Sequence, residues 1–228
     1  MIDIVIPLGK GSKHNNIELD YCIKGIKKHL KGYGNIYIIG ENPKRDDVVF
    51  IQHTESAKPV FKERNICDKL LHASSMAQVS DTFLYMNDDH FLLQDIDVDK
   101  FPFHHKGILP NTSGDNVYYR SLKNTYRALS AKGFDTLNYD VHAPMLIHKE
   151  AFIRTMSAYD WSVSYGYVIK SLYANTTGIT GSFVRDVKMN KSYSEPEIKA
   201  KIDGQMYFSI GDAGLNDAMK KVLKELYD

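Results

Sequence analysis

The sequence has few of the features that would place it outside ordinary globular proteins. It contains only two cysteines, Cys22 and Cys67, each in an apolar periodic stretch, which argues against a disulfide framework and favours buried free thiols in a reducing compartment. No charge of one sign predominates, because 29 Lys and Arg residues stand against 28 Asp and Glu residues. This balance removes the simplest argument for a nucleic-acid binder or a polybasic membrane protein, since both concentrate Lys and Arg.

The chain also lacks a long apolar run. No window approaches the roughly 18 apolar residues that a membrane span needs, and the first residues carry neither a long apolar core nor a cleavage site of the secretory type. We therefore expect a cytoplasmic protein with no transmembrane segment. Its 228 residues, 43% of them hydrophobic, suffice for one sizeable core, so a single domain over residues 1–228 is predicted.

Short β-branched runs alternate with helical patterns along the first half of the chain. Residues 2–6 form a predicted buried strand, residues 17–30 carry apolar residues at the helical period, and residues 36–39 form a second apolar run. This order predicts parallel strands joined by a right-handed crossover.

The same alternation continues up to an acidic motif. Residues 48–51 are a predicted strand, residues 62–79 a helix, and residues 82–86 a strand that runs directly into Asn87-Asp88-Asp89-His90. The predicted fold is an open α/β sheet, in which ligands bind beyond the carboxyl ends of the strands. The second half is less regular, with predicted strands at 107–109, 144–147 and 205–210 and predicted helices at 118–131, 149–158 and 217–226.

The acidic motif is the sharpest local signal for chemistry. Placing Asp88 beside Asp89 at a sheet edge costs like-charge repulsion, which a divalent cation would offset. Oxygen ligands with one imidazole suit Mg²⁺ or Mn²⁺, with a diphosphate completing the coordination shell. A solvated Asn-Asp turn is the alternative that turn chemistry alone would favour.

Residues 18–93 resemble the second conserved region of the Stealth family, whose members are nucleotide-sugar-dependent sugar-phosphate transferases. The matching residues follow the family's order: Glu18-Leu19-Asp20-Tyr21-Cys22-Ile23-Lys24-Gly25-Ile26, then the apolar run that ends at Pro43, then His53, then Asn87-Asp88-Asp89. Two later elements look similar, namely His142-Ala143-Pro144 and Phe208-Ser209-Ile210-Gly211-Asp212. This resemblance implies a nucleotide-sugar donor and a metal-dependent transfer.

The opening of the chain resembles glycosyltransferases of the GT-A fold instead. Ile4-Val5-Ile6-Pro7 looks like their first strand, and Arg64-Asn65 looks like the pair that lies by the nucleotide in those enzymes. The resemblance implies a GT-A-like, Rossmann-like mixed sheet flanked by helices, with a metal at Asp88 and Asp89. It also implies a donor site that includes Pro7, Arg64, Asn65 and Asn87. The expected donor is a UDP-sugar, and the acceptor is a hydroxyl of an unidentified glycan, lipid-linked sugar or nucleobase.

Several further residues are candidates for binding and catalysis. The loop Gly9-Lys10-Gly11-Ser12 would supply donors to phosphates, or would be a simple surface loop. His142 is predicted either as a third metal ligand or as a general base, with a structural histidine as the alternative. Asp140 would orient His142 or act as the base itself, and Asp212 would line the acceptor site or cap the last helix.

The sequence therefore predicts a glycosyltransferase with residues 1–93 as the nucleotide-sugar and metal half and residues 94–228 as the acceptor half. Trp161 and the tyrosines around it would form a stacking platform for the acceptor, or a core. The first alternative function is a Stealth-type sugar-1-phosphate transferase. The second is a non-catalytic, Ca²⁺-dependent carbohydrate-binding module.

Overall fold

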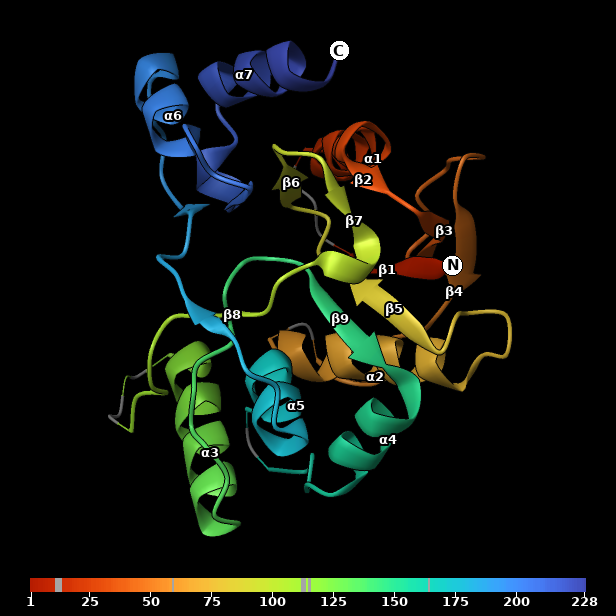
Figure 1. The fold of residues 1–228 in the computed structure, drawn as a ribbon, viewed down its shortest axis with the longest axis vertical. Coiled ribbons are helices and arrows are strands. Elements are labelled where there is room, and N and C mark those ends of the chain that lie inside the picture. The colour runs from red at the N-terminus through yellow and green to blue at the C-terminus, as the bar shows by residue number, and fades with distance from the viewer. Residues whose placement is uncertain (11–13, 59, 112–113, 115, 164) are drawn as a thin grey trace.

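A five-stranded sheet forms the centre of the molecule, with its strands in the order β4-β3-β1-β5-β9 (Figure 1). The structure is a computed structural model that describes residues 1–10, 14–58, 60–111, 114, 116–163 and 165–228. β9 is antiparallel to β5, with Met145 opposite Tyr85, and the other neighbouring pairs are parallel. The strands are β1 (Ile2–Leu8), β3 (Tyr33–Gly40), β4 (Val49–Gln52), β5 (Thr82–Tyr85) and β9 (Met145–His148).

Strand β1 lies in the middle of the sheet because its side chains are apolar on both faces. Ile4, Val5 and Ile6 are completely buried, as expected for a parallel strand that is covered by helices on both sides. Val5 packs into the core on one face, while Ile4 and Ile6 pack into the core on the other. The continuous apolar run at residues 2–6 thus correctly predicted a buried strand.

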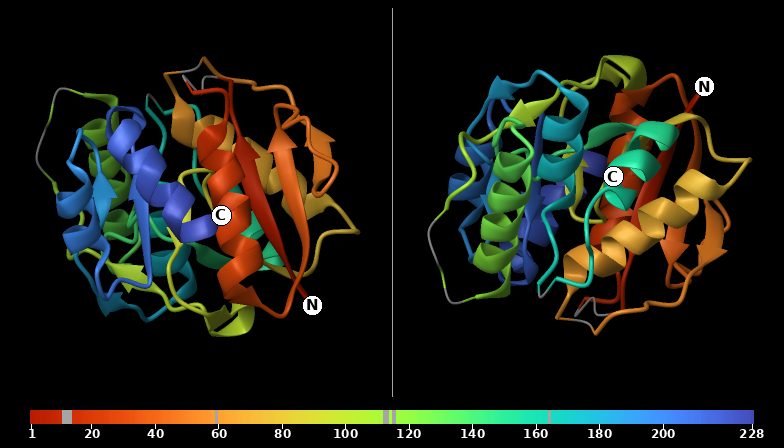
Figure 2. Two further views of the ribbon diagram at one scale, coloured as in Figure 1. Left: turned by 90° about the horizontal axis from the view of Figure 1, so that it is seen from above. Right: turned by 90° about the horizontal axis from the view of Figure 1, so that it is seen from below.

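Helices cover both faces of this sheet, as the two views in Figure 2 show. On one face lie α2 (Lys62–Ser75), α4 (Lys149–Ser157), α5 (Ile169–Thr177) and, packed against α5, α3 (Val117–Ala131). On the other face lies α1 (Ile17–His29), which contacts α7 (Asp217–Tyr227), and α7 in turn packs on α6 (Glu195–Ile202). None of the helices among the described residues has the length and apolar character needed to cross a membrane.

A smaller sheet brings the end of the chain beside the acidic turn. It contains β11 (Lys188–Met189), β12 (Tyr207–Ile210) and β6 (His90–Leu92), and β12 runs antiparallel to β6 with Ser209 opposite His90. Two short pairs are the other strands of the described residues: β2 (Leu30–Lys31) with β7 (Ile96–Asp97), and β8 (His104–His105) with β10 (Ser182–Phe183). Two 3-10 helices, Val98–Lys100 and Asp212–Gly214, lie between these elements.

Most predicted elements are confirmed, and three expectations are wrong. The predicted helix 62–79 ends at Ser75, where the hydroxyl groups of Ser74 and Ser75 bond to carbonyls of the preceding turn. Residues 107–109 form only a single bridge, Ile108 to Leu137, and not a strand. The last helix is capped by the side chain of Asn216, and not by Asp212. Cys22 and Cys67 are buried free thiols, as predicted.

Candidate active site

The acidic turn lies where the strand order of the central sheet reverses. From β1 the chain builds outward through β3 and β4 and then returns to the other side of β1 with β5, so the switch lies between β1 and β5. Ligands of open α/β sheets bind at such a point, beyond the carboxyl ends of the strands. Asn87, Asp88 and Asp89 follow the end of β5 at this edge. The sequence prediction for their position is therefore confirmed.

Neighbouring side chains fix the conformation of this turn. Tyr85 donates its hydroxyl hydrogen to Asn87 Oδ1 at 2.8 Å, and the thiol of Cys22 donates to the Asn87 carbonyl at 3.5 Å. The backbone N–H of Asn87 donates to His90 Nδ1 at 3.2 Å. Because Nδ1 is the acceptor there, His90 Nε2 carries the hydrogen of the neutral ring. Burial holds the pKa of His90 well below its ordinary value, so this histidine is a neutral core residue.

The two carboxylates of the turn are crowded and partly withdrawn from water. Burial, and then the charges of Asp89 and Glu18, raise the pKa of Asp88 to about 7. Lys188 from β11 pairs with Asp89 Oδ2 at 3.1 Å. Asp89 Oδ1 is buried without a hydrogen-bond partner and lies 3.9 Å from His90 Nε2, which also lacks a partner, as does the buried hydroxyl of Ser209. Unsatisfied buried polar groups of this kind indicate a site that a ligand or water completes.

The donor chemistry of this turn fits a hard divalent cation. Mg²⁺ usually takes one or two carboxylates and completes its shell with water and substrate phosphates, and Asp88 with the unpartnered Asp89 Oδ1 would supply those carboxylates. Within the described part of the chain, no group of three or more His, Cys, Asp and Glu side chains is placed to hold a metal. His142 therefore does not complete a three-residue set with Asp88 and Asp89 in this structure.

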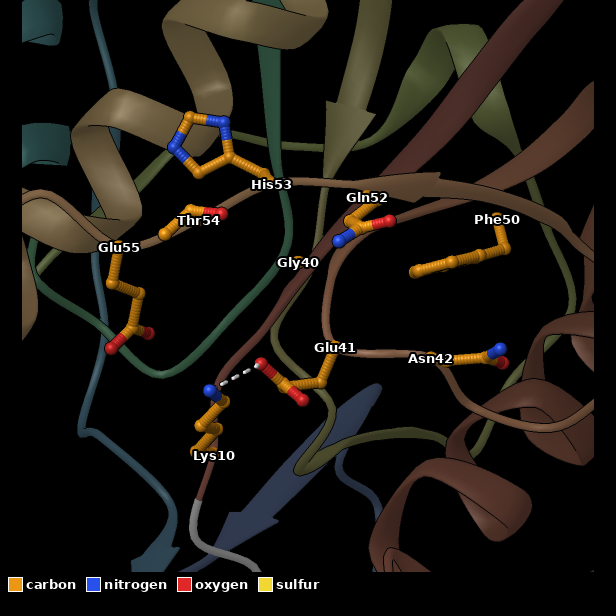
Figure 3. A pocket seen from close by; sticks show the side chains of 9 residues that line it. All are labelled: Lys10, Gly40, Glu41, Asn42, Phe50, Gln52, His53, Thr54 and Glu55. Atoms are coloured by element: carbon orange, nitrogen blue, oxygen red, sulfur yellow. Dashed lines mark ion pairs between the residues drawn. The ribbon is translucent and has the colours of Figure 1, made fainter.

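A polar cavity of about 380 Å³ opens at the same edge, beside the ends of β3 and β4. Figure 3 shows Lys10 and Glu41 facing each other on one side of it, with their charged groups 3.7 Å apart, and Phe50 and Gln52 on the other. The remaining lining residues are Gly40, Asn42, His53, Thr54 and Glu55. Lys10, which the sequence predicts as a phosphate-binding residue, thus lines a polar cavity. Gly11 and Ser12 of the same loop lie outside the described residues.

Five of the predicted donor-site residues do not line this cavity, namely Pro7, Gly9, Arg64, Asn65 and Asn87. Pro7 is buried within β1. Asn65 is 3% exposed. Its side chain hydrogen-bonds to the backbone N–H and to the carbonyl of Ala57, and so fixes the conformation of the loop around residues 55–57. Arg64 donates instead to the carbonyl of Trp161 at 3.4 Å. Pro7, Arg64 and Asn65 thus lie outside the lining of this cavity, and their contacts with a nucleotide stay predictions. Gly9, which follows β1, lies against the Glu55 side chain.

His142 lies beside the acidic turn, and its partner is Asp186. Because β9 is antiparallel to β5, the residues that precede β9 lie at the carboxyl edge. Asp186 Oδ1 accepts the backbone N–H of His142 at 3.0 Å, and Oδ2 lies 2.7 Å from His142 Nδ1. Of the two roles predicted for Asp140, orienting His142 is not observed, because Asp140 accepts the hydroxyl of Tyr118 at 2.6 Å instead, and its role as the base stays a prediction. Asp186 was not found from the sequence.

A half-buried cluster of opposite charges extends from His142 toward α2 and α5. Burial would raise the pKa of Asp186, but the bond from His142 and the charge of Lys106, 3.1 Å away, hold it well below its ordinary value. Burial, and then the charge of Asp140, raise the pKa of Glu63 to about 8. Lys170 lies between these groups and is 5% exposed.

Asp212 and the aromatic residues occupy two further positions around the site. The antiparallel register of β12 and β6 brings the end of β12, and with it Gly211 and Asp212, beside the start of β6 and the acidic turn. Trp161 and Tyr165 contribute to a separate cavity of about 140 Å³ with Phe61 and Arg64. The aromatic cluster is therefore partly core and partly an open surface.

Comparisons with known proteins find the same fold in a sugar transferase. The chain is similar to the structure of galactosyltransferase LgtC in complex with donor and acceptor sugar analogs, with 11% identity over 99% of this chain and 95% of that one and a TM-score of 0.54. A second similar structure, an active-site mutant of LgtC, has the same identity and coverage and a TM-score of 0.51. No protein-family model and no curated protein matches the chain. The predicted GT-A-like fold is confirmed, while the link to the Stealth family stays a prediction.

Proposed function

We propose that this protein is a metal-dependent glycosyltransferase that moves a sugar from a nucleotide sugar, a UDP-sugar, to an acceptor hydroxyl. One observation carries the proposal: the carboxylates of Asp88 and Asp89 lie at the switch point of the sheet, at the same edge as a polar cavity. The fold shared with LgtC, which has been crystallised with donor and acceptor analogs, supports the same class of reaction.

The cavity suits a nucleoside, and its distance from the acidic turn suits a diphosphate. The ring of Phe50 offers a stacking surface for a base, and the carboxylate of Glu41 offers acceptors for ribose hydroxyls. Lys10 would meet the first phosphate. Neighbouring strands are about 4.8 Å apart, so β5 lies about 10 Å from β3, with β1 between them. A nucleoside diphosphate that enters the cavity would therefore extend across the end of β1 to Asp88 and Asp89.

The proposed reaction needs charge neutralisation at the donor and a base at the acceptor. Mn²⁺ or Mg²⁺, held by Asp88 and Asp89, would stabilise the charge on the departing diphosphate as a Lewis acid. His142 takes the proton of the acceptor hydroxyl on Nε2, and the hydroxyl oxygen forms a bond to the anomeric carbon. The bond from that carbon to the phosphate oxygen breaks, and its electron pair leaves with the nucleoside diphosphate. Asp186 stabilises the imidazolium that forms.

A screen of nucleotide sugars with Mn²⁺ tests this proposal, with the released nucleotide as the readout. A diphosphate is the expected product, whereas a monophosphate would instead indicate Stealth-type transfer of the sugar phosphate. Asp89→Ala should abolish turnover, and Asp135→Ala, which removes an exposed aspartate of a distant loop, should leave it unchanged.

Binding is measured separately from turnover. UDP with Mn²⁺ at 100 times its Kd should stabilise the fold by about 2.7 kcal/mol, which raises the Tm by about 5 to 10 °C for a chain of this size. The absence of any such shift with UDP or other nucleoside diphosphates, together with no turnover of any donor, would contradict the proposed function.

A further inference from the structure

The segment Val141-His142-Ala143 belongs to no helix or strand, yet a buried charge from a distant helix holds its backbone. The ammonium group of Lys170, on α5, donates to the carbonyl of Val141 at 2.7 Å and to the carbonyl of Ala143 at 2.8 Å. These are the residues on either side of His142. An ammonium group removed from water is stable only if it is paired and hydrogen-bonded. Lys170 therefore keeps these two carbonyls, and the histidine between them, in one arrangement.

A second distant residue fixes the imidazole ring of His142. The ionised carboxylate of Asp186 can only accept hydrogen bonds, so Nδ1, at 2.7 Å from Oδ2, must carry the ring hydrogen. Nε2 of the neutral ring is then left with its lone pair, as a base requires. The backbone N–H of His142 donates to the other oxygen of the same carboxylate, so Asp186 fixes the ring and the backbone at once.

We propose that Lys170 and Asp186 are positioning residues that together form a clamp on His142, in which Lys170 fixes the backbone and Asp186 selects the tautomer with a free Nε2. The role of Nε2 as the base rests on the proposed function, whereas the clamp is a property of the folded chain. The carboxylates whose charges act on Lys170 include Asp140, Asp186, Glu63 and Asp89, and its ammonium group lies 5.5 Å from the centre of the Tyr85 ring. Lys106, 3.1 Å from Asp186 Oδ2, keeps that carboxylate paired.

Asp186→Asn gives a specific test of the tautomer, because the amide has one acceptor and one donor. Lys106→Met is introduced in all compared variants, so that its ammonium group does not compete for the amide oxygen; the backbone N–H of His142 then takes that oxygen, and the NH₂ group is turned toward Nδ1. Nδ1 must then accept, which moves the ring hydrogen to Nε2. Long-range ¹H–¹⁵N NMR of the histidine rings measures this without any substrate. We expect hydrogen on Nδ1 in the wild type and in Asp186→Glu, and on Nε2 in Asp186→Asn. An unchanged tautomer in Asp186→Asn would overturn the part assigned to Asp186.

The chain provides a matched control for Lys170. Lys149 is also a buried lysine that donates to two carbonyls, those of Met76 and Val79, but it lies away from His142. Lys170→Met and Lys149→Met should lose similar stability, whereas only Lys170→Met should give a mixture of His142 tautomers. If the His142 signals are the same in both variants, the part assigned to Lys170 is wrong.

Kinetics then connect the clamp to the reaction. We expect kcat to fall by about 10²-fold or more in Asp186→Asn and in Lys170→Met, because general base catalysis typically contributes about 10²–10⁴-fold. KM for the donor should stay within about twofold, Asp186→Glu should recover part of the rate, and Lys149→Met should keep the wild-type kcat. Wild-type protein that turns over no donor contradicts the proposed function, and the NMR result still decides the clamp. A kcat unchanged in Asp186→Asn, with the tautomer switched, would overturn the link to catalysis.

Discussion

Glu63 should make the protein less stable as the pH rises from 5.5 to 7.5. Its Oε2 accepts the N–H of Ile169 at the start of α5, at 3.2 Å, and burial together with Asp140 raises its pKa to about 8. In the unfolded chain this carboxyl titrates near its ordinary value of about 4.3. Between these two values the folded state holds a proton that the unfolded state has lost, so folding becomes less favourable with increasing pH.

The size of the effect follows from one extra bound proton. The free energy of unfolding should fall by about 1.4 kcal/mol per pH unit from Glu63 alone, or about 2 to 3 kcal/mol over the window. Glu63→Gln keeps an acceptor for Ile169 but does not titrate, so it should already be more stable than the wild type by about 1.6 kcal/mol at pH 5.5, and this difference should grow by about 2 to 3 kcal/mol at pH 7.5. Urea unfolding at pH 5.5, 6.5 and 7.5 measures this, with the exposed Glu150→Gln as control. Parallel pH curves for wild type and Glu63→Gln would refute the reasoning.

Two further predictions concern the cavity and the strand beside it. Gly40 has a φ of +128°, and a Cβ there would lie 2.1 Å from the Leu8 carbonyl oxygen; Gly40→Ala should cost more than about 2 kcal/mol in urea unfolding. Gly133→Ala, at a positive φ with nothing within 4 Å, should cost less, and equal losses would show that the close approach to β1 is unimportant. Phe50→Ala should weaken UDP binding by about 5- to 150-fold in calorimetry, because base stacking on an aromatic ring contributes about 1–3 kcal/mol. The exposed Phe134→Ala should have no effect, and unchanged affinity in Phe50→Ala would exclude stacking on this ring.

The sequence was sufficient for features that depend on local pattern. Continuous apolar runs predicted β1, β3 and β5, and the polar residues directly after β5 predicted a site at the carboxyl edge. Both inferences work because burial on two faces demands apolar residues throughout, and because the end of a parallel strand lies at a fixed edge.

The sequence pattern did not predict contacts between segments that lie far apart in the chain. Asp186 follows an arginine in a stretch with no periodic pattern, and its partner His142 lies 44 residues earlier. Asp140, only two residues from His142, was therefore the closer candidate in sequence, although it bonds to Tyr118 instead. Two features of the sequence could have predicted more of the structure. The single Lys170 in the apolar stretch 168–174 indicates a buried charge that needs partners, and Ser194 with Glu197, which form the capping box of α6, indicates the start of a helix.

The charged side chains of the candidate site are unbalanced, because negative carboxylates outnumber positive ammonium groups. The overall net charge of +1 conceals a cluster at the carboxyl edge in which carboxylates outnumber ammonium groups. Lys106, Lys170 and Lys188 face Glu18, Glu63, Asp88, Asp89, Asp140 and Asp186. The excess of carboxylates shows in two raised pKa values: that of Asp88 rises to about 7 and that of Glu63 to about 8, and among the described residues neither carboxylate has a lysine within ion-pair distance. Asp89 and Asp186 each have a lysine at 3.1 Å. A divalent cation at Asp88 and Asp89 would supply the charge that the chain does not, and the diphosphate of a donor would hold that cation in place.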